Sequence, residues 1–131
     1  MVDLAFIVAK RPTGAAAELL AKMVAAIGYT METVTVSEAA AAANARPAAR
    51  IYVVLGSDAF KIFVPGQRAA LGLWTNVGEI PTVVTYSPAR ILTFYANDAV
   101  QLTNAKRQIW SDLKSALAHL GKKPPSRSAK S

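Results

Sequence analysis

Short apolar runs alternate with helix-like stretches along the chain, and this alternation limits the fold more than any other feature of the sequence. Four runs rich in apolar or β-branched residues have the pattern of buried strands, and they cover residues 4–9, 33–36, 51–55 and 82–86. Strands that alternate with helices favour a parallel sheet covered by helices on both faces. The sequence therefore predicts a three-layer α/β/α domain with a four-stranded, mostly parallel sheet.

The stretches after the first three runs have the features of helices. Residues 15–27 carry a stripe of apolar side chains that ends at Gly28. Residues 38–43 are rich in alanine, and Ser37 is the expected N-cap of that helix. A third helix follows the turn Gly56-Ser57 and ends before Pro65.

The last predicted helix is the longest, and it sets the expected limit of the folded domain. It begins after an interruption at Pro88, with Asn97 or Asp98 as alternative N-caps, and it reaches Leu120. Before Pro88, residues 67–81 are irregular, with a turn at 78–79 that predicts a small hairpin. The 131 residues fit one domain, expected at 1–120, followed by a basic tail at 121–131.

Ligands of such a sheet bind beyond the carboxyl ends of the strands, which are expected at 9–14, 37–38, 56–58 and 87–92. Glu38 and Asp58 are the two acids at that edge, although a carboxylate in the first turn of a helix often serves only the helix dipole. The turn Gly56-Ser57-Asp58 either presents backbone N–H groups to a phosphate or simply caps a helix. It lacks the glycine pattern of a Rossmann loop or a P-loop.

Several kinds of chemistry are excluded by the residues that the chain lacks. There is no cysteine, and the one histidine, His119, shares a predicted polar helix face with Gln108, Asp112 and Ser115. We expect His119 and Asp112 to lie at the helix surface. A Ser-His-Asp triad, a Cys-His pair, an iron-sulfur cluster and a histidine-based metal centre are therefore not expected. No cofactor is predicted.

The net charge of +7 favours an acidic partner such as nucleic acid. At the strand ends the candidate binding residues are Lys10, Arg11 and Arg90, and Trp74 is an aromatic that either stacks on a ligand or belongs to the core. The tail adds Lys122, Lys123, Arg127 and Lys130, which either bind a partner or only increase solubility. No apolar run is long enough to span a membrane, so we expect a cytoplasmic protein.

The order and spacing of four segments resemble the uracil-DNA glycosylase superfamily. Residues 14–28 are similar to the helix after the first catalytic loop of that family, and residues 51–59 resemble its Val-x-x-Leu-Gly-x-x-Ala strand and turn. Residues 72–74 with 80–90 are similar to the approach to its second motif, and residues 106–113 to its last helix. The resemblance implies a glycosylase-like fold for residues 4–120.

The same resemblance implies that the catalytic residues of the family are missing. The first motif is shortened to residues 9–14 and has no acid that could position water, and the histidine of the second motif aligns with Ser87 in the segment Ser87-Pro88-Ala89-Arg90. The asparagine that reads the base aligns with Ser37 or Glu38. We therefore expect a protein that is not an enzyme. An atypical glycosylase that uses Ser87 or Glu38 is an alternative.

The psi subunit of bacterial DNA polymerase III is a noncatalytic relative on this scaffold. Its segment Ser-Pro-Ala is similar to residues 87–89, and its helix with Ala-x-x-Trp character is similar to residues 105–110. This resemblance implies a docking subunit in DNA replication or repair, with a clamp-loader or chi-like partner that the tail could help to bind. A nonspecific DNA-binding module that uses Lys10, Arg11, Arg90 and the tail is the other alternative.

Overall fold

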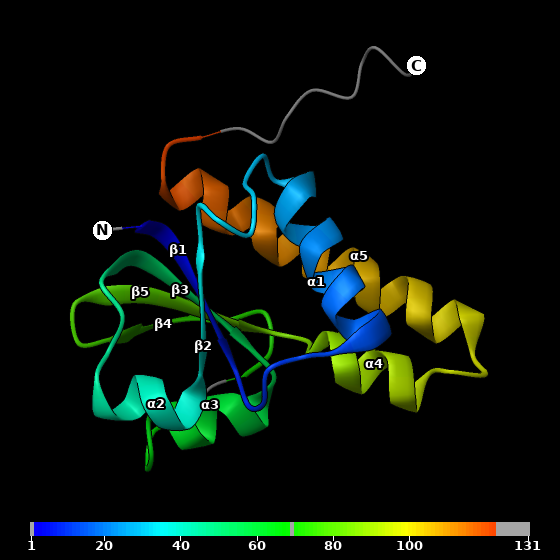
Figure 1. Cartoon of the computed structure of the whole chain (residues 1–131), viewed down its shortest axis with the longest axis horizontal. Coiled ribbons are helices and arrows are strands. Elements are labelled where there is room, and N and C mark those ends of the chain that lie inside the picture. Colours follow the sequence, from blue (N-terminus) through cyan, green and yellow to red (C-terminus); the bar gives the residue numbers. More distant parts are fainter. Residues whose placement is uncertain (1, 69, 123–131) are drawn as a thin grey trace.

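A computed structural model describes residues 2–68 and 70–122, which form a mixed five-stranded sheet and five helices in an α/β arrangement (Figure 1). The strands are β1 (Val2–Val8), β2 (Thr35–Glu38), β3 (Ala49–Leu55), β4 (Trp74–Val77) and β5 (Ile80–Thr85). They lie in the order β2-β1-β3-β5-β4, and only β4 runs antiparallel to its neighbour in the described sheet. The predicted α/β class is confirmed, but the prediction of four strands was one short.

Helices cover both faces of the sheet. On one face lie α1 (Gly14–Ala26), α4 (Pro88–Phe94) and α5 (Ala99–His119), and on the other lie α2 (Ala39–Asn44) and α3 (Ser57–Phe63) (Figure 1). Alternate residues of β3 serve the two cores, since Val53 belongs to the first buried cluster and Tyr52 and Val54 belong to the second. Because both faces are covered, the central strands β1 and β3 are largely apolar.

The second strand and the helix after it are shifted from their predicted positions. The strand was expected at 33–36, but parallel pairing of Ile7 with Ser37 and of Val8 with Glu38 extends β2 to Glu38. Ser37 therefore lies in a strand and is not the N-cap. Glu38 occupies the N-cap position of α2, and its side chain makes no capping hydrogen bond.

Helix α4 occupies a segment that the sequence analysis treated as an interruption. Pro88 stands in the first turn, where a missing backbone N–H costs nothing because that N–H would have no partner within the helix. The Ser87 hydroxyl accepts a hydrogen bond from the Arg90 backbone N–H at 3.4 Å. Pro88 therefore starts a helix here.

The predicted turn at Gly78-Glu79 is confirmed, and it joins β4 and β5 in an antiparallel hairpin. Trp74, in β4, donates a hydrogen bond from its indole Nε1 to the Ser115 hydroxyl at 2.9 Å. This bond attaches the edge strand to α5.

The long helix α5 begins at one of its two predicted caps. Asp98 is the N-cap, and its carboxylate accepts a hydrogen bond from the Gln101 backbone N–H at 3.0 Å. The expectation that Asp112 lies at the helix surface was wrong, because its exposed fraction is only 5%. The loop at Gly72 lies against Asp112, whose carboxylate also accepts a hydrogen bond from Gln108 at 2.9 Å.

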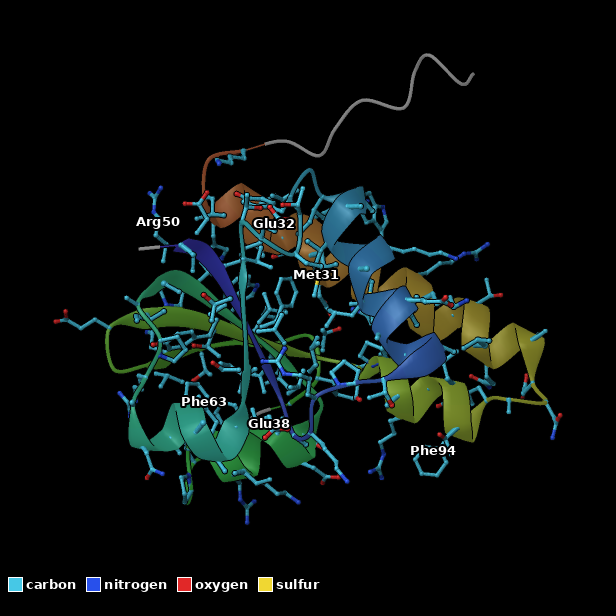
Figure 2. All side chains as sticks on the ribbon, viewed as in Figure 1. Met31, Glu32, Glu38, Arg50, Phe63 and Phe94 are labelled. Atoms are coloured by element: carbon cyan, nitrogen blue, oxygen red, sulfur yellow. The ribbon has the colours of Figure 1, made fainter. Side chains whose placement is uncertain are left out.

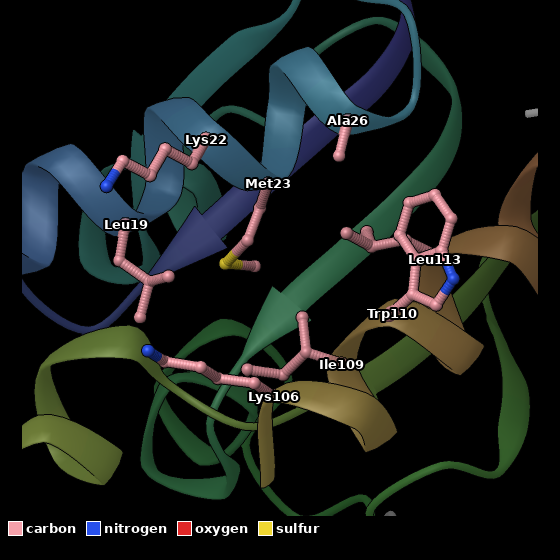
Figure 3. Close-up of a pocket in the computed structure, with 8 residues that line it drawn as sticks. All are labelled: Leu19, Lys22, Met23, Ala26, Lys106, Ile109, Trp110 and Leu113. Atoms are coloured by element: carbon pink, nitrogen blue, oxygen red, sulfur yellow. The ribbon is translucent and has the colours of Figure 1, made fainter. Parts of the chain in front are cut away.

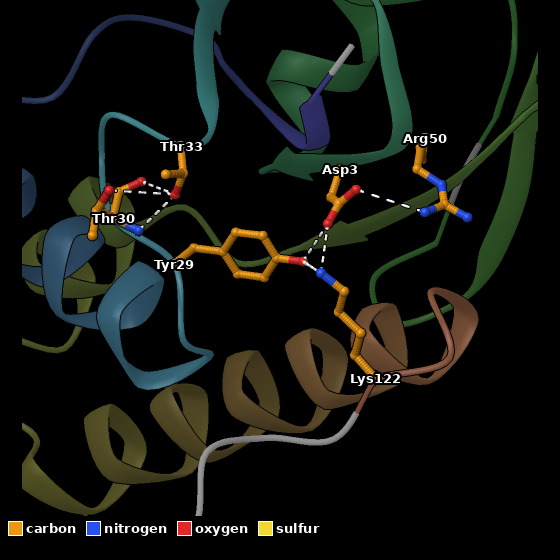
Figure 4. A network of polar contacts seen from close by, with 6 residues as sticks. All are labelled: Asp3, Tyr29, Thr30, Thr33, Arg50 and Lys122. Carbon is orange, nitrogen blue, oxygen red and sulfur yellow. Dashed lines mark hydrogen bonds and ion pairs between the residues drawn. The ribbon is translucent and has the colours of Figure 1, made fainter.

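A polar network joins β1 to the segment after α5 (Figure 4). The Lys122 ammonium donates to the Asp3 carboxylate at 2.8 Å, and the Tyr29 hydroxyl donates to the same carboxylate at 2.7 Å. These bonds lower the pKa of Asp3, the Lys122 bond most strongly, and the bond to Asp3 raises the pKa of Lys122. Burial raises the pKa of Tyr29, and Arg50 lies 3.7 Å from the carboxylate of Asp3.

Among residues 2–68 and 70–122, no helix combines the length and the apolar character needed to cross a membrane.

Candidate functional site

The carboxyl ends of β3 and β5 meet at a hollow that we call the strand-end cleft. It comprises two adjoining cavities of about 340 Å³ and 180 Å³. Both are lined by Gly56, Ser57, Ser87, Arg90 and Phe94. Ala89 lines the larger cavity, whereas Leu71, Tyr86 and Tyr95 line the smaller one. The sequence predicted a site at this edge of the sheet, and the hollow lies there.

Gly56 forms part of the cleft floor through its backbone. Its φ is +106° and its ψ is 146°, a conformation that is nearly restricted to glycine. Its N–H donates to the Thr85 carbonyl oxygen at 2.8 Å, and a Cβ at this position would lie 3.3 Å from the Ser87 Cβ. A side chain at this position would therefore crowd Ser87 where the ends of β3 and β5 approach each other.

Two charged side chains of the cleft are paired with each other. Arg90 Nη1 lies 2.9 Å from a carboxylate oxygen of Asp58, and the Arg90 guanidinium lies 4.7 Å from the centre of the Phe94 ring. Arg90 and Asp58 are both more than half exposed, so the pair adds little stability but does favour one orientation of each side chain. Phe94 is 64% exposed and projects from α4 (Figure 2).

The remaining predicted residues of the sheet edge lie outside the cleft. The Glu38 carboxylate accepts a hydrogen bond from the Arg11 backbone N–H at 2.9 Å, and the Arg11 guanidinium donates to the Val36 carbonyl at 2.8 Å. These bonds fix the loop after β1 against β2. Ser37 is half-buried in β2, and Lys10 is exposed in the loop.

Trp74, in the edge strand β4, and His119, at the end of α5, form a separate pair. Their rings are stacked, with centres 3.9 Å apart and an angle of 26° between the planes. The expectation that His119 is exposed is confirmed, but one face of its ring is covered by Trp74. Neither residue lines the strand-end cleft.

The basic tail is described only at its start. Lys122 contacts Asp3 and Tyr29, so its ammonium already has partners within the domain. Lys123, Arg127 and Lys130 lie outside the described residues.

Within the part of the chain that the structure describes, no group of three or more His, Cys, Asp or Glu side chains is placed to hold a metal ion.

A second hollow, which the sequence analysis did not identify, lies between α1 and α5 and has a volume of about 380 Å³ (Figure 3). We call it the interhelical groove. Its lining residues are Leu19, Lys22, Met23 and Ala26 from α1, and Lys106, Ile109, Trp110 and Leu113 from α5. In the sequence, the feature that could have indicated this groove is Trp110, an aromatic residue beside the predicted apolar stripe of the last helix. That feature does not show how far α1 and α5 lie from each other, so it does not predict a groove.

Comparisons with known proteins give no relative from which a role could be transferred. No protein-family model matches the chain, and no curated protein matches its sequence.

Proposed function

We propose that this protein is a noncatalytic docking subunit on a uracil-DNA glycosylase-like scaffold, and that it binds a partner protein in DNA replication or repair. The resemblance to the psi subunit of DNA polymerase III supports this role, and it implies a clamp-loader or chi-like partner. The α/β sheet with helices on both faces is compatible with such a scaffold.

One observation carries the proposal: the two acids at the strand ends, Asp58 and Glu38, are both bonded to neighbouring groups of the protein. Asp58 pairs with Arg90, and Glu38 accepts a hydrogen bond from the backbone of Arg11. Ser87, which takes the place of the catalytic histidine in the resemblance, caps α4. A serine hydroxyl cannot match an imidazole as donor to an anionic leaving base, and loss of one such donor costs about 10²- to 10³-fold in rate.

Nonspecific DNA binding is the second candidate function. It is favoured by the net charge of +7 and by the position of Arg90 in a cleft beside two serine hydroxyls. In that case the affinity for DNA must fall steeply with salt, because each phosphate contact releases counterions. An affinity that does not change with salt would exclude this role.

The absence of catalysis can be tested with excess protein and labelled uracil-containing DNA, single-stranded and double-stranded, in one turnover. We expect abasic sites to form no faster than in matched DNA that lacks uracil. Excision that is lost in Ser87→Ala or Glu38→Gln would make the protein an enzyme and would overturn the proposal.

The docking role needs a separate test. The immobilised full chain is exposed to an extract of its source cell, and the retained proteins are identified. Recovery of replication or repair proteins, above the level retained by an unrelated basic protein of similar charge, supports the proposal. Recovery of none contradicts it.

A further inference from the structure

We infer that the interhelical groove binds an acidic, amphipathic segment of the partner protein. This inference rests on the proposed docking function, and it specifies both the surface that docks and the chemistry of what binds there.

The floor of the groove is apolar and belongs to the core. Met23, Ile109 and Leu113 are buried at its base, whereas Leu19 and Trp110 are half-buried at its sides. The volume of about 380 Å³ lies within the range of about 300–1,000 Å³ that is typical of binding pockets. Side chains of a partner would therefore meet a preformed apolar surface.

The groove is open because α1 packs mainly against α4 and makes few close approaches to α5. Figure 3 shows Leu19 and Met23 of α1 and Trp110 of α5 directed toward the space between the helices, whereas Lys22 extends along α1. Ala26 contributes only a methyl group from α1, which leaves room beside the indole of Trp110 on α5. A helix laid between two others is a common way to fill such a groove, with apolar side chains at every third or fourth position.

The charges beside this apolar floor are mostly positive. Lys22 and Lys106 line the groove and are exposed, and the Lys114 ammonium lies 5.7 Å from the centre of the Trp110 ring. The exposed charged residues of α5 are all basic, because the one acidic residue of this helix, Asp112, is buried. On α1 a single acid, Glu18, stands one turn before Lys22. This distribution is complementary to a partner with carboxylates around its apolar residues.

Other occupants match the groove less well. The chain's own tail is basic, with Lys123, Arg127 and Lys130, and a second copy would bring the same lysines and a further net charge of +7. Nucleic acid would satisfy the lysines through its phosphates, but it would leave the apolar floor without a partner. An acidic segment with spaced apolar residues satisfies both features.

The probe for the test is a displayed library of random peptides, selected on the immobilised full chain. We expect the enriched peptides to be acidic and to carry apolar residues at every third or fourth position. Their affinities are then measured by fluorescence anisotropy for the wild type, for Lys22→Glu combined with Lys106→Glu, and for Lys61→Glu combined with Arg68→Glu. The last variant makes the same change of charge at exposed residues away from the groove.

The groove variant should bind the enriched peptides about tenfold or more weakly at low salt, because two attractive contacts become repulsive. The control variant should bind them within about twofold of the wild type. Exchanging the carboxylates of the peptide for lysines should restore binding to the groove variant and abolish binding to the wild type. Both substituted lysines are exposed, so the groove variant should unfold at the same urea concentration as the wild type.

Enrichment of no peptide, enrichment of basic peptides, or equal binding by the groove variant would each overturn the inference. Single-stranded DNA whose binding is lost in the groove variant alone would assign the lysines to nucleic acid and would also overturn it. If a captured replication or repair protein binds the groove variant as well as the wild type, the inference fails while the docking function stands. Excision of uracil would instead remove the docking function itself.

Discussion

Gly56 combines a strained backbone conformation with a close neighbour at the carboxyl ends of β3 and β5. Its φ of +106° with a ψ of 146° lies in a region that side chains avoid, and a Cβ there would crowd Ser87 at 3.3 Å. We therefore expect Gly56→Ala to lower the free energy of unfolding by about 3 kcal/mol, measured by urea denaturation.

A comparison variant measures the cost of a positive φ at a position where a Cβ meets no neighbour. Gly66 also has a positive φ, of +85°, but a Cβ there would meet nothing within 4 Å. Gly66→Ala should therefore cost only about 1–2 kcal/mol. Equal losses in the two variants would show that the approach to Ser87 is not restrictive.

The burial of Asp112 could not be predicted from the helical repeat of the sequence. The position of Asp112 in the helical repeat, with Gln108 and Ser115, places it on a polar face at the flank of the apolar stripe. It is buried all the same, because the loop at Gly72 and the hairpin strand β4 pack over that part of α5. Helical periodicity describes the helix alone, and it contains no information on which loop covers its polar face.

At the scale of the elements, the cap of α5 gives a direct test of its predicted start. The sequence left Asn97 and Asp98 as alternatives, and the carboxylate of Asp98 caps the Gln101 N–H at 3.0 Å. Asp98→Ala should lower the free energy of unfolding by about 1 kcal/mol, read from the midpoint of urea denaturation. Asn97→Ala should change it by less than about 0.5 kcal/mol. The reverse order of effects would assign the cap to Asn97.

Strands and helices could be predicted where a residue pattern is typical of one structure. They could not be predicted where the same residue type occurs in two structures. Buried apolar runs identified the strands β1, β3 and β5, and the turn at Gly78-Glu79 identified the hairpin. Pro88 was interpreted as a break because proline interrupts strands, yet proline equally starts helices. Ser37 was interpreted as a cap because serine caps helices, but pairing with β1 holds it in β2.

Of the two candidate sites, one could be predicted from the sequence and the other could not. The strand-end cleft was predictable because the connectivity of a parallel sheet brings Gly56 and Ser87 to one edge. The pairing of Arg90 with Asp58 across that edge needs the three-dimensional distance between two loops. The interhelical groove was not predicted at all, since it arises from the separation of α1 and α5 in space.

At the scale of the whole molecule, the pair Asp3 and Lys122 links stability to pH. The pKa of Asp3 is lowered from 3.8, so its contribution is present above that pH and is lost as the pH falls through the lower folded-state value. The pKa of Lys122 is raised from 10.5, so its contribution is present below that pH and is lost as the pH rises through the higher value.

We therefore expect Asp3→Asn to be less stable than the wild type by a constant amount across neutral pH. The difference should shrink as the pH falls below about 3.8, where the wild-type carboxylate becomes protonated as well. Urea denaturation at a series of pH values measures it, with Glu79→Gln, an exposed acid of the β4–β5 turn, as the control. A difference that does not change with pH would show that the charge of Asp3 does not stabilise the fold.

The contact between Asp3 and Lys122 also holds the two ends of the described chain close together. Its beginning and end lie side by side, joined by an ion pair of 2.8 Å (Figure 4). A linker between these two ends would therefore have only a short distance to span. A circularly permuted chain, linked between these ends and opened at the exposed turn after Gly78, should fold to the same far-ultraviolet spectrum. The proposed docking function can then be tested with the tail relocated to the interior of the sequence.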